Sequence, residues 1–511
     1  MKSAQKVVLN TGILYSRMLI TIGITFYTTR EVLNALGATD YGIYNLIAGV
    51  IAMLSFLNAA MSTSTQRYLS FHQGNADKNV LKSIFSTSLL LHICIGFILV
   101  TGIELSGLYL FDGFLNIPSE RLPTARTVYH FMSMSVFFTI VSVPFTASLN
   151  SNENMLGLSI VNIIEVVLKL IIAIGINGYS GDRLIAYGLS MACISFISLM
   201  IYVVYCNIHY EECTLRLKKH THLGRIKNLT SFAGWNLFGA LTGIGKTQGV
   251  AILLNVFFGT SINAAYGIAN QVSSQMNFFS ATMLKAINPR IMKTEGQGNR
   301  LQMLRLAMMA SKFGYFLLAF VAIPCIFEMD NILNFWLKSV PPYTASFCSL
   351  ILVAIMVNQL TVGLDSAIQA IGKIKYYMIV AGTIKLLIVP VGYILLKYGL
   401  PPIYVIIGYT VFEGIAGIAR LKLLEITGGL DIKAYIKNVY TGIIPPTLAI
   451  ISSLYFIVSI SSSPYRLFYN IPFSIMIFFI SIYGWGLCKD EKQIVDNLIA
   501  NTFKRLHLKW I

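Results

Sequence analysis

The sequence predicts an all-α integral membrane protein with 14 transmembrane helices. We expect two parallel six-helix lobes around a central cleft, followed by two additional C-terminal helices. The first observation is composition: 56% of the 511 residues are hydrophobic and 12% are charged, about half the charged fraction of a soluble domain. The second is that apolar runs near the ~20 residues needed to cross a bilayer core recur from end to end. The third is an internal repeat.

The repeat begins with the stretch at 33–45 and reappears in looser form in the second half of the chain. The matching pairs are Leu33-Asn34 with Leu254-Asn255, Tyr41-Gly42-Ile43 with Tyr266-Gly267-Ile268, Arg67 with Arg290, and Gly74-Asn75 with Gly298-Asn299. Their offsets are 221, 225, 223 and 224 residues. Four matches in one order, with nearly constant spacing, indicate an internal duplication.

Polar residues, glycine and proline separate fourteen apolar spans along the chain. The expected spans are 7–29, 41–63, 83–110, 126–149, 155–177, 184–206, 229–257, 262–285, 305–327, 345–371, 376–397, 402–421, 439–460 and 465–487. The shortest separations are the turn at 150–154 and the region of Phe258-Gly259. No loop exceeds about two dozen residues, so no soluble catalytic domain is expected.

Lysine and arginine predict the orientation. With a cytoplasmic N-terminus, the inside regions carry 26 basic residues and the outside loops carry 7. This asymmetry predicts that both termini are cytoplasmic. Spans one and seven are six crossings apart, so the two copies have the same orientation and form parallel repeats. We expect an N-terminal lobe at 1–206, a basic cytoplasmic linker at 207–228, a C-terminal lobe at 229–424, and two extra helices with a tail at 425–511.

Several functions are disfavoured. The formal charge of +17 is spread between apolar spans rather than gathered on a nucleic-acid-binding module, so no nucleic-acid partner is expected. The seven cysteines show no paired or metal-like spacing, and we expect no metal and no cofactor. The segment Gly243-Ile-Gly-Lys-Thr247 lacks the first glycine of a phosphate-binding loop and lies within a span. No catalytic motif is recognisable, so we predict a transporter rather than an enzyme.

Charged residues inside spans are the candidate functional groups, because such groups are costly in hydrocarbon. Arg17 lies about ten residues into the first span, and Lys246 lies in the first span of the second repeat. Measured from the repeated Leu-Asn pair, they differ in depth by ~12 Å. Lys169 and Lys385 add cations at other depths. A cleft with cations at several depths and few acids suits an anionic passenger.

Each cation also has a plainer explanation. Lys169 has Glu165 one helical turn away, so a private ion pair is about equally expected. Lys312 lies near the cytoplasmic end of its span and is expected to extend its ammonium to the interface. The acids Asp365 and Glu413 are candidates for proton or cation coupling, or equally for pairing with Lys385 or Arg420. These alternatives remain open.

The layout and several motifs resemble bacterial polysaccharide-export flippases of the Wzx type, in the multidrug/oligosaccharidyl-lipid/polysaccharide exporter superfamily. The resemblance rests on the 6+6+2 layout and on three segments: Asn10-Thr-Gly-Ile-Leu-Tyr-Ser-Arg17, Leu36-Gly-Ala-Thr-Asp-Tyr-Gly-Ile-Tyr-Asn45 and Gln66-Arg67-Tyr-Leu-Ser70. In related lipid II flippases a serine-arginine pair in the first span matters, and Ser16-Arg17 matches it. Their further arginine-aspartate pair has no match at Gly23-Ile24-Thr25, which argues against lipid II as the substrate.

The resemblance implies translocation of an undecaprenyl-diphosphate-linked oligosaccharide, a repeat unit of O-antigen (lipopolysaccharide), capsule or another surface polysaccharide. The route would run from the cytoplasmic to the periplasmic leaflet of the bacterial inner membrane, by alternating access. It further implies a groove for the lipid tail at the two extra helices. A glycan polymerase and glycosyltransferases are possible partners, and H⁺ or Na⁺ is a possible coupling ion. We expect Arg17 and Lys246 to hold the diphosphate at successive stages.

Three rival functions remain. A cation-coupled multidrug exporter of the same superfamily would typically carry an acid in its first span, and none lies between Met1 and Arg30. A membrane glycosyltransferase or polymerase would need larger outward loops. A structural scaffold would not require buried cations. The sugar composition of the substrate is not readable from these features.

Overall fold

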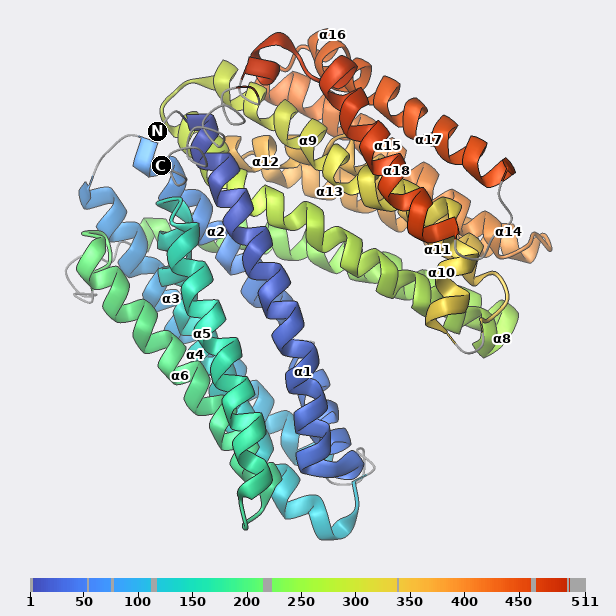
Figure 1. Cartoon of the computed structure of the whole chain (residues 1–511). Helices are drawn as coiled ribbons and strands as arrows, with labels where there is room; N and C mark the ends of the chain where they lie inside the picture. The colour runs from blue at the N-terminus through green and yellow to red at the C-terminus, as the bar shows by residue number, and fades with distance from the viewer. Residues whose placement is uncertain are drawn as a thin grey trace, which may run out of the picture. The chain divides into compact units, whose positions relative to one another are not determined.

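The computed structural model describes residues 3–52, 55–74, 78–111, 117–214, 223–337, 340–460, 466–493 and 496. Every secondary-structure element in these ranges is a helix (Figure 1), which confirms the predicted all-α class. Lys338, residues 215–222 of the predicted basic linker and residues 497–511 of the predicted tail lie outside the described residues. The chain divides into two compact units, Leu9–Leu237 and a second comprising Met1–Val8 with Phe238–Ile511.

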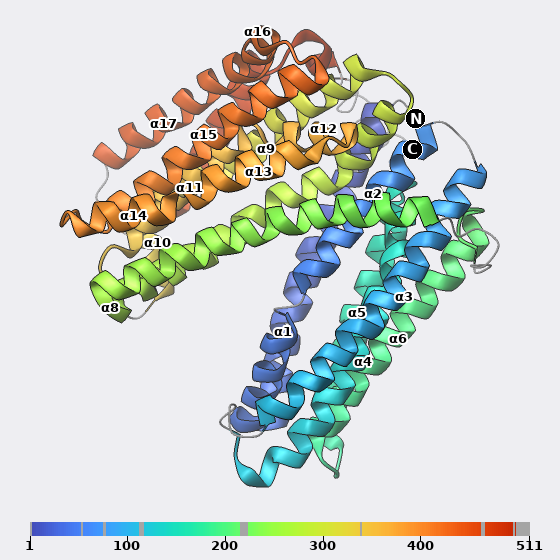
Figure 2. The same ribbon diagram turned by 180° about the vertical axis from the view of Figure 1, so that it is seen from behind.

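The first unit is a bundle of long helices that run side by side in both ribbon views (Figures 1 and 2). Its helices are α1 (Ser3–Ala52), α2 (Ser55–Gly74), α3 (Lys78–Tyr109), α4 (Leu122–Ser151), α5 (Met155–Gly175), α6 (Arg183–His209) and the beginning of α8 (Leu223–Gly296). Short 3₁₀ turns at Ser119–Arg121 and Ile176–Gly178 precede α4 and follow α5. Helix α4 packs against α2, α3 and α6, so its side chains form much of the unit's interior.

The second unit contains the rest of α8 and the C-terminal helices. They are α9 (Arg300–Phe327), α10 (Met329–Trp336), α11 (Thr344–Gln359), α12 (Val362–Ile371), α13 (Ile374–Leu386), α14 (Ile388–Lys397), α15 (Ile403–Gly428), α16 (Ile432–Tyr435), α17 (Thr441–Ile460) and α18 (Arg466–Ser481), with π-helical segments at Ile436–Tyr440 and Ile482–Gly486. Helix α15 packs against α11, α12, α13 and α14, so charged groups on it are surrounded by protein.

Nine helices within the described ranges are long and apolar enough to cross a membrane. In addition, α11 and α12 together are long and apolar enough, with a bend of 42° between them, as in a broken span or a re-entrant loop. The protein is therefore a polytopic membrane protein. The helix ends follow the predicted punctuation closely: α4 ends at Ser151 and α5 begins at Met155, with the Asn154 side chain accepting the Gly157 N–H at 2.9 Å as an N-cap. The count of fourteen spans stays a prediction.

Two glycines of the internal repeat adopt the same unusual backbone conformation. Gly37 interrupts α1 with φ 77° and ψ 168°, and Gly259 interrupts α8 with φ 77° and ψ −168°. Only glycine readily adopts these angles, because a Cβ would collide with the backbone. The two glycines stand at the predicted boundaries between the first two spans of each repeat. The duplication inferred from sequence is thus matched by a shared local geometry.

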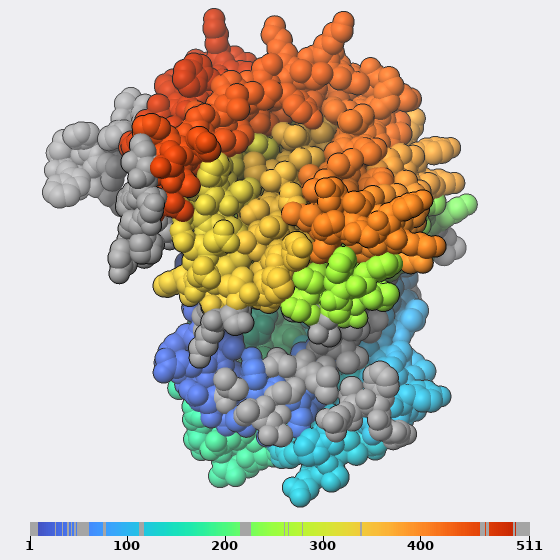
Figure 3. All heavy atoms as spheres, turned by 90° about the vertical axis from the view of Figure 1, so that its right-hand side faces the viewer, coloured from blue at the N-terminus to red at the C-terminus, as the bar shows by residue number. Residues whose placement is uncertain are grey.

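The C-terminal helices are attached to α9 by two buried ion pairs. Near the middle of α9, Lys312 Nζ lies 2.7 Å from Glu491 Oε2. Past the C-terminal end of α9, Arg466 Nε lies 2.8 Å from Glu328 Oε1, which also accepts from Asn470 Nδ2 at 2.7 Å. The two attachments are roughly 24 Å apart along the helix axis. Figure 3 shows the red and orange C-terminal segment lying directly against the yellow helices of this unit.

This geometry corrects the expectation for Lys312. The sequence predicted that its ammonium extends to the membrane interface, but the residue is only 1% exposed. Its partner Glu491 lies 179 positions away in the chain. No acidic residue lies one helical turn from Lys312 in the sequence, so the sequence did not predict this ion pair.

We predict that Gly37→Ala lowers the free energy of unfolding by about 1–3 kcal/mol, because alanine must adopt a conformation that only glycine tolerates. Beyond its own local backbone, a Cβ at Gly37 would meet nothing within 4 Å, so the cost comes from the local backbone conformation and not from a clash with another segment. Thermal unfolding of the purified protein in detergent measures the effect.

Gly12→Ala is the matched control, since Gly12 lies within the same helix with ordinary φ and an equally open Cβ position. It should leave stability unchanged or raise it. Equal destabilisation by both substitutions would contradict the assignment of strain to Gly37.

Candidate functional site

The first unit contains a polar cavity of about 530 Å³ between α2, α4, α5 and α6. Its lining residues are Ser62, Thr139, Ser142, Val143, Thr146, Glu165, Ser195, Ser198, Leu199 and Tyr202. Seven of the ten carry a hydroxyl group and one carries a carboxylate. The volume lies within the range of small-molecule sites. Four of these hydroxyls donate to carbonyls of their own helices. Their oxygens can still accept hydrogen bonds, so the cavity suits a ligand with several donor groups.

Arg17, predicted from the sequence, is linked to this cavity through two side chains. Its Nη1 donates to Asn162 Oδ1 at 3.4 Å, and Asn162 Nδ2 donates to the Tyr202 hydroxyl at 3.2 Å. Tyr202 lines the cavity. Within the described ranges the guanidinium contacts an amide rather than a carboxylate, so its positive charge is not neutralised by this contact.

Glu165 and Lys169 form the ion pair that their spacing predicted. Lys169 Nζ lies 2.7 Å from Glu165 Oε1, and the two side chains are 38% and 34% exposed. Glu165 is also the carboxylate that lines the cavity. Two predicted cations are therefore connected to residues of one cavity, Lys169 directly to Glu165 and Arg17 through Asn162 to Tyr202. With Glu165 offset by Lys169, Arg17 leaves this group with one positive charge in excess.

The other two predicted cations belong to the second unit and share one acid. Lys246 Nζ of α8 lies 2.6 Å from Glu413 Oε1, and Lys385 Nζ of α13 lies 3.0 Å from Glu413 Oε2. The Lys246 ammonium also lies 3.9 Å from the ring centroid of Tyr409, a cation–π contact. The sequence left open whether Glu413 pairs with a lysine, and the structure gives it two.

Arg420 and Asp365 add two more charges to the group formed by Lys246, Lys385 and Glu413. Arg420 is 3% exposed, and its guanidinium donates to Tyr377 Oη at 3.0 Å, Thr361 Oγ1 at 2.8 Å and Asn358 Oδ1 at 3.3 Å. Asp365 accepts from Gln369 Nε2 at 3.2 Å. The sequence placed Arg420 at the end of a span and did not identify it as a buried site residue.

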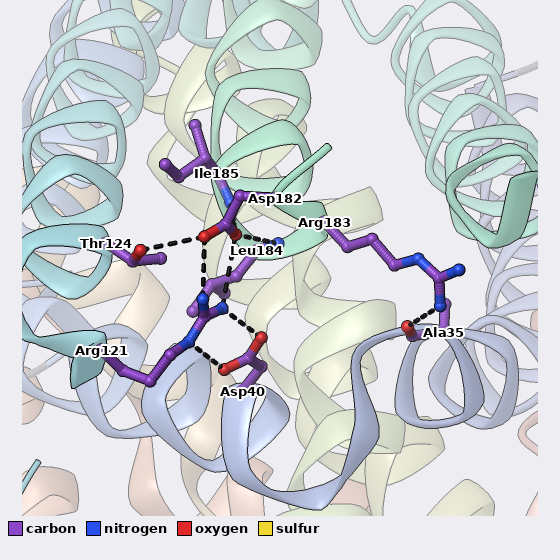
Figure 4. Close-up of polar contacts among 8 residues, drawn as sticks. All are labelled: Ala35, Asp40, Arg121, Thr124, Asp182, Arg183, Leu184 and Ile185. Carbon is purple, nitrogen blue, oxygen red and sulfur yellow. Dashed lines mark hydrogen bonds and ion pairs between the residues drawn. The ribbon is translucent and has the colours of Figure 1, made fainter. Parts of the chain in front are cut away.

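A charged network at one end of the first unit joins three segments that are distant in sequence (Figure 4). Arg121 Nε donates to Asp40 Oδ1 at 2.9 Å, and Arg121 Nη1 donates to Asp182 Oδ2 at 2.9 Å. Arg183 Nη1 donates to the Ala35 carbonyl at 3.1 Å. Asp40 and Ala35 flank Gly37, so this network holds the repeated 33–45 stretch against the beginnings of α4 and α6. In the orientation prediction, Arg121 and Arg183 are two of the seven basic residues in the outside loops. No local pattern in the sequence indicated that they take part in a network.

Asp182 is the central acceptor of the network. It also caps α6, accepting the Leu184 N–H at 3.0 Å and the Ile185 N–H at 3.2 Å, and it accepts from Thr124 Oγ1 at 3.0 Å. Partial burial raises the pKa of Asp182, but the hydrogen bonds from Arg121, Ile185 and Thr124 outweigh that effect. The net pKa lies below its ordinary value of 3.8.

We predict that Arg121→Gln lowers the free energy of unfolding by about 1–3 kcal/mol, because it leaves two carboxylates close together without their shared donor. Lys78→Gln, which breaks an ion pair whose side chains are 70% and 65% exposed, should change stability by less than ~1 kcal/mol. Unfolding in detergent at pH 7 compares the two.

The contribution of Asp182 to the free energy of unfolding should depend on pH in a definite direction. Because the folded-state pKa of Asp182 is depressed, its contribution is present above pH 3.8 and disappears as the pH falls through the folded pKa. The difference between wild type and Arg121→Gln should therefore shrink in acid well below pH 3.8. A difference that grows in acid would contradict this account.

Comparison with known proteins gives the fold but no family by sequence. No family model matches the chain, and no curated protein matches it. Solved structures do match. MATE in the bent conformation has a TM-score of 0.68 at 15% identity, covering 86% of this chain and 99% of that one.

Two further structures match equally well. One is a MOP superfamily transporter from Pyrococcus furiosus Vc1, described as having a binding pocket of reverse polarity that suggests a different function; its TM-score is 0.68 at 14% identity, covering 85% of this chain and 99% of that one. The other is a multidrug resistance MATE family transporter of the MOP superfamily in the outward-facing conformation, with a TM-score of 0.66 at 15% identity and coverage of 86% and 99%. The chain therefore has the fold of MATE transporters of the MOP superfamily.

Proposed function

We propose that this chain is a membrane transporter that flips an undecaprenyl-diphosphate-linked oligosaccharide repeat unit from the cytoplasmic to the periplasmic leaflet of the bacterial inner membrane. The mechanism we propose is alternating access, with both termini in the cytoplasm. The resemblance of the 10–17, 36–45 and 66–70 motifs to Wzx-type flippases supports this substrate class. The MATE-like fold supports transport in general.

The observation that carries the proposal is the hydroxyl-lined cavity whose residue Tyr202 is linked through Asn162 to Arg17. Its hydroxyl-rich lining suits the hydrogen bonds of a sugar. The Arg17 charge suits a phosphate, since a guanidinium binds phosphate oxygens through strong charge-assisted hydrogen bonds. A lipid-linked oligosaccharide presents both groups. Lys169 is a further candidate ligand near the same cavity, and Glu165 is a candidate site for a coupling H⁺ or Na⁺.

The membrane potential favours the proposed direction. Moving a negative charge outward from a negative interior is favourable by ~2.3 kcal/mol per charge for each 100 mV. Coupling to an ion is therefore not required for the anion itself. Lys246 and Lys385, with the acids Asp365 and Glu413, form the second proposed group of diphosphate-binding and coupling residues.

A multidrug exporter is the second candidate, because one structural neighbour is described as a multidrug resistance transporter. A cationic drug would meet the uncompensated charge of Arg17 and would be repelled. The two candidates differ in what the expressed protein restores. A flippase restores surface glycan to a flippase-null strain, whereas a drug exporter raises the tolerated concentration of cationic drugs.

We predict that Arg17→Ala abolishes surface glycan in a complemented flippase-null strain, while the protein level in the membrane stays normal. The reason is that the headgroup loses its cationic partner at the cavity. Glycan display and membrane immunoblotting measure the two quantities. Lys78→Ala, which removes an exposed cation of the same unit, should leave glycan display unchanged. Full display in Arg17→Ala would refute the role of Arg17.

We further predict that Ser142→Trp reduces glycan display by at least about tenfold, because an indole would fill part of the cavity. Thr127→Trp is the matched control: Thr127 lies on the same helix, is solvent- or lipid-exposed and is not among the lining residues. Equal loss from both variants would show that the cavity itself is not required.

A further inference from the structure

We propose that Lys246 and Lys385 form a binding site for a phosphate-type anion, and that Glu413 occupies this site as an internal competitor in the ligand-free chain. The identification of the anion as a lipid diphosphate rests on the proposed function. The anion site itself rests on the geometry and the charge of the group around Glu413.

The geometry is that of two ammonium groups holding one bidentate acid. Glu413 presents Oε1 to Lys246 at 2.6 Å and Oε2 to Lys385 at 3.0 Å. The lysines come from α8 and α13 and the acid from α15, so three helices position the three groups. Two oxygens of a phosphate have the same charge and nearly the same spacing as a carboxylate. A phosphate would therefore find both lysines already oriented.

The charge of the group is unbalanced. Among the described residues, three cations (Lys246, Lys385 and Arg420) lie with two carboxylates (Glu413 and Asp365), so one positive charge is in excess. The Arg420 guanidinium is hydrogen-bonded to neutral side chains. An uncompensated buried charge is costly in a membrane protein. A further anion would lower that cost, which is why this group is suited to binding one.

The three charged side chains of the group differ in exposure. The side chains of Lys246 and Glu413 are 9% and 5% exposed, whereas that of Lys385 is 21% exposed. An anion would therefore meet Lys385 first and then compete with Glu413 for Lys246. A diphosphate carries more negative charge than a carboxylate, so it is a stronger partner for the two lysines.

Another buried ion pair of the same unit provides a contrast. Lys312 and Glu491 lie 2.7 Å apart, with side chains 1% and 10% exposed. Here one acid meets one lysine, so the pair is neutral and has no excess charge to offer. The proposal predicts anion binding at the Glu413 group and not at this pair.

The test measures pyrophosphate binding to the purified full-length protein in detergent by calorimetry. Removing the competing charge in Glu413→Gln should tighten pyrophosphate binding by about tenfold or more, because like-charge repulsion is relieved. Lys246→Gln and Lys385→Gln should each weaken it by about tenfold relative to wild type. Glu491→Gln is the matched control and should leave the affinity unchanged.

Lys385→Gln keeps the test decisive if Glu413→Gln does not fold, since it leaves the Lys246–Glu413 pair intact. In the wild type, pyrophosphate should raise the unfolding temperature, and Lys385→Gln should remove that shift. Unchanged or weaker binding in a folded Glu413→Gln protein would overturn the proposal. If Glu491→Gln tightened pyrophosphate binding as much as Glu413→Gln does, the proposal would also be overturned.

Farnesyl diphosphate provides the second arm, which separates a lipid headgroup from free phosphate. Binding of farnesyl diphosphate that responds to Glu413 and Lys385 supports the site with a lipid source. A response to pyrophosphate alone supports the anion site and contradicts the lipid assignment. If neither probe binds while Arg17 is still required for glycan display, this inference fails and the transport proposal stands.

Discussion

A charge buried in the hydrocarbon region of a membrane is expensive, and its partner has to be supplied by the protein. In the second unit this constraint links helices that are far apart in the chain. Glu413 meets Lys246 from 167 residues away, and Glu491 meets Lys312 from 179 residues away. Removing one member of such a pair leaves an isolated buried charge, a loss of about 3–5 kcal/mol. The packing of α8, α9 and α15 therefore depends on these acids being present.

The first unit meets the same constraint in a different way. Its two candidate site cations lie near a hydroxyl-lined cavity instead of inside a closed cluster: Arg17 contacts the amide of Asn162, and Lys169 pairs with a half-exposed Glu165. Hydroxyl groups and water within a cavity reduce the cost of a charge, so a carboxylate partner is not needed for every cation. Two halves that share the Gly37 and Gly259 geometry thus differ in their interiors. The repeat conserves the helix plan, while the charged side chains differ between the copies.

Local features of the fold were predictable from the sequence because they depend on neighbouring residues. The turn at 150–154 follows from its asparagines, the breaks at Gly37 and Gly259 from glycine's conformational range, and the Lys169–Glu165 pair from helical spacing. Sequence patterns did not predict ion pairs whose partners are distant in the chain. No local pattern indicated that Glu413 would serve two lysines.

Sequence separation between partners also explains why the Arg121 network was missed and the position of Lys312 was predicted wrongly. Arg121 was visible only as a loop charge, since its partners Asp40 and Asp182 lie 81 and 61 residues away. Lys312 was expected at the interface, because Glu491 follows it only after the chain has formed several further helices. Both cases require knowledge of which segments pack together. The repeat predicted a difference in depth between Arg17 and Lys246 but not the partners of either cation.

The fold alone does not identify the passenger, because one architecture can serve ligands of either charge. At 14–15% identity, the likeness to MATE structures carries the helix arrangement and nothing about specificity. The sign of the passenger has to be argued from the charges around the cavity. Glu165, the carboxylate in its lining, is already offset by Lys169, whereas the Arg17 guanidinium meets only a neutral amide. Among the described residues, a cation entering this cavity would find its one lining carboxylate already paired. The uncompensated charge of Arg17, linked to the lining residue Tyr202 through Asn162, favours an anion instead.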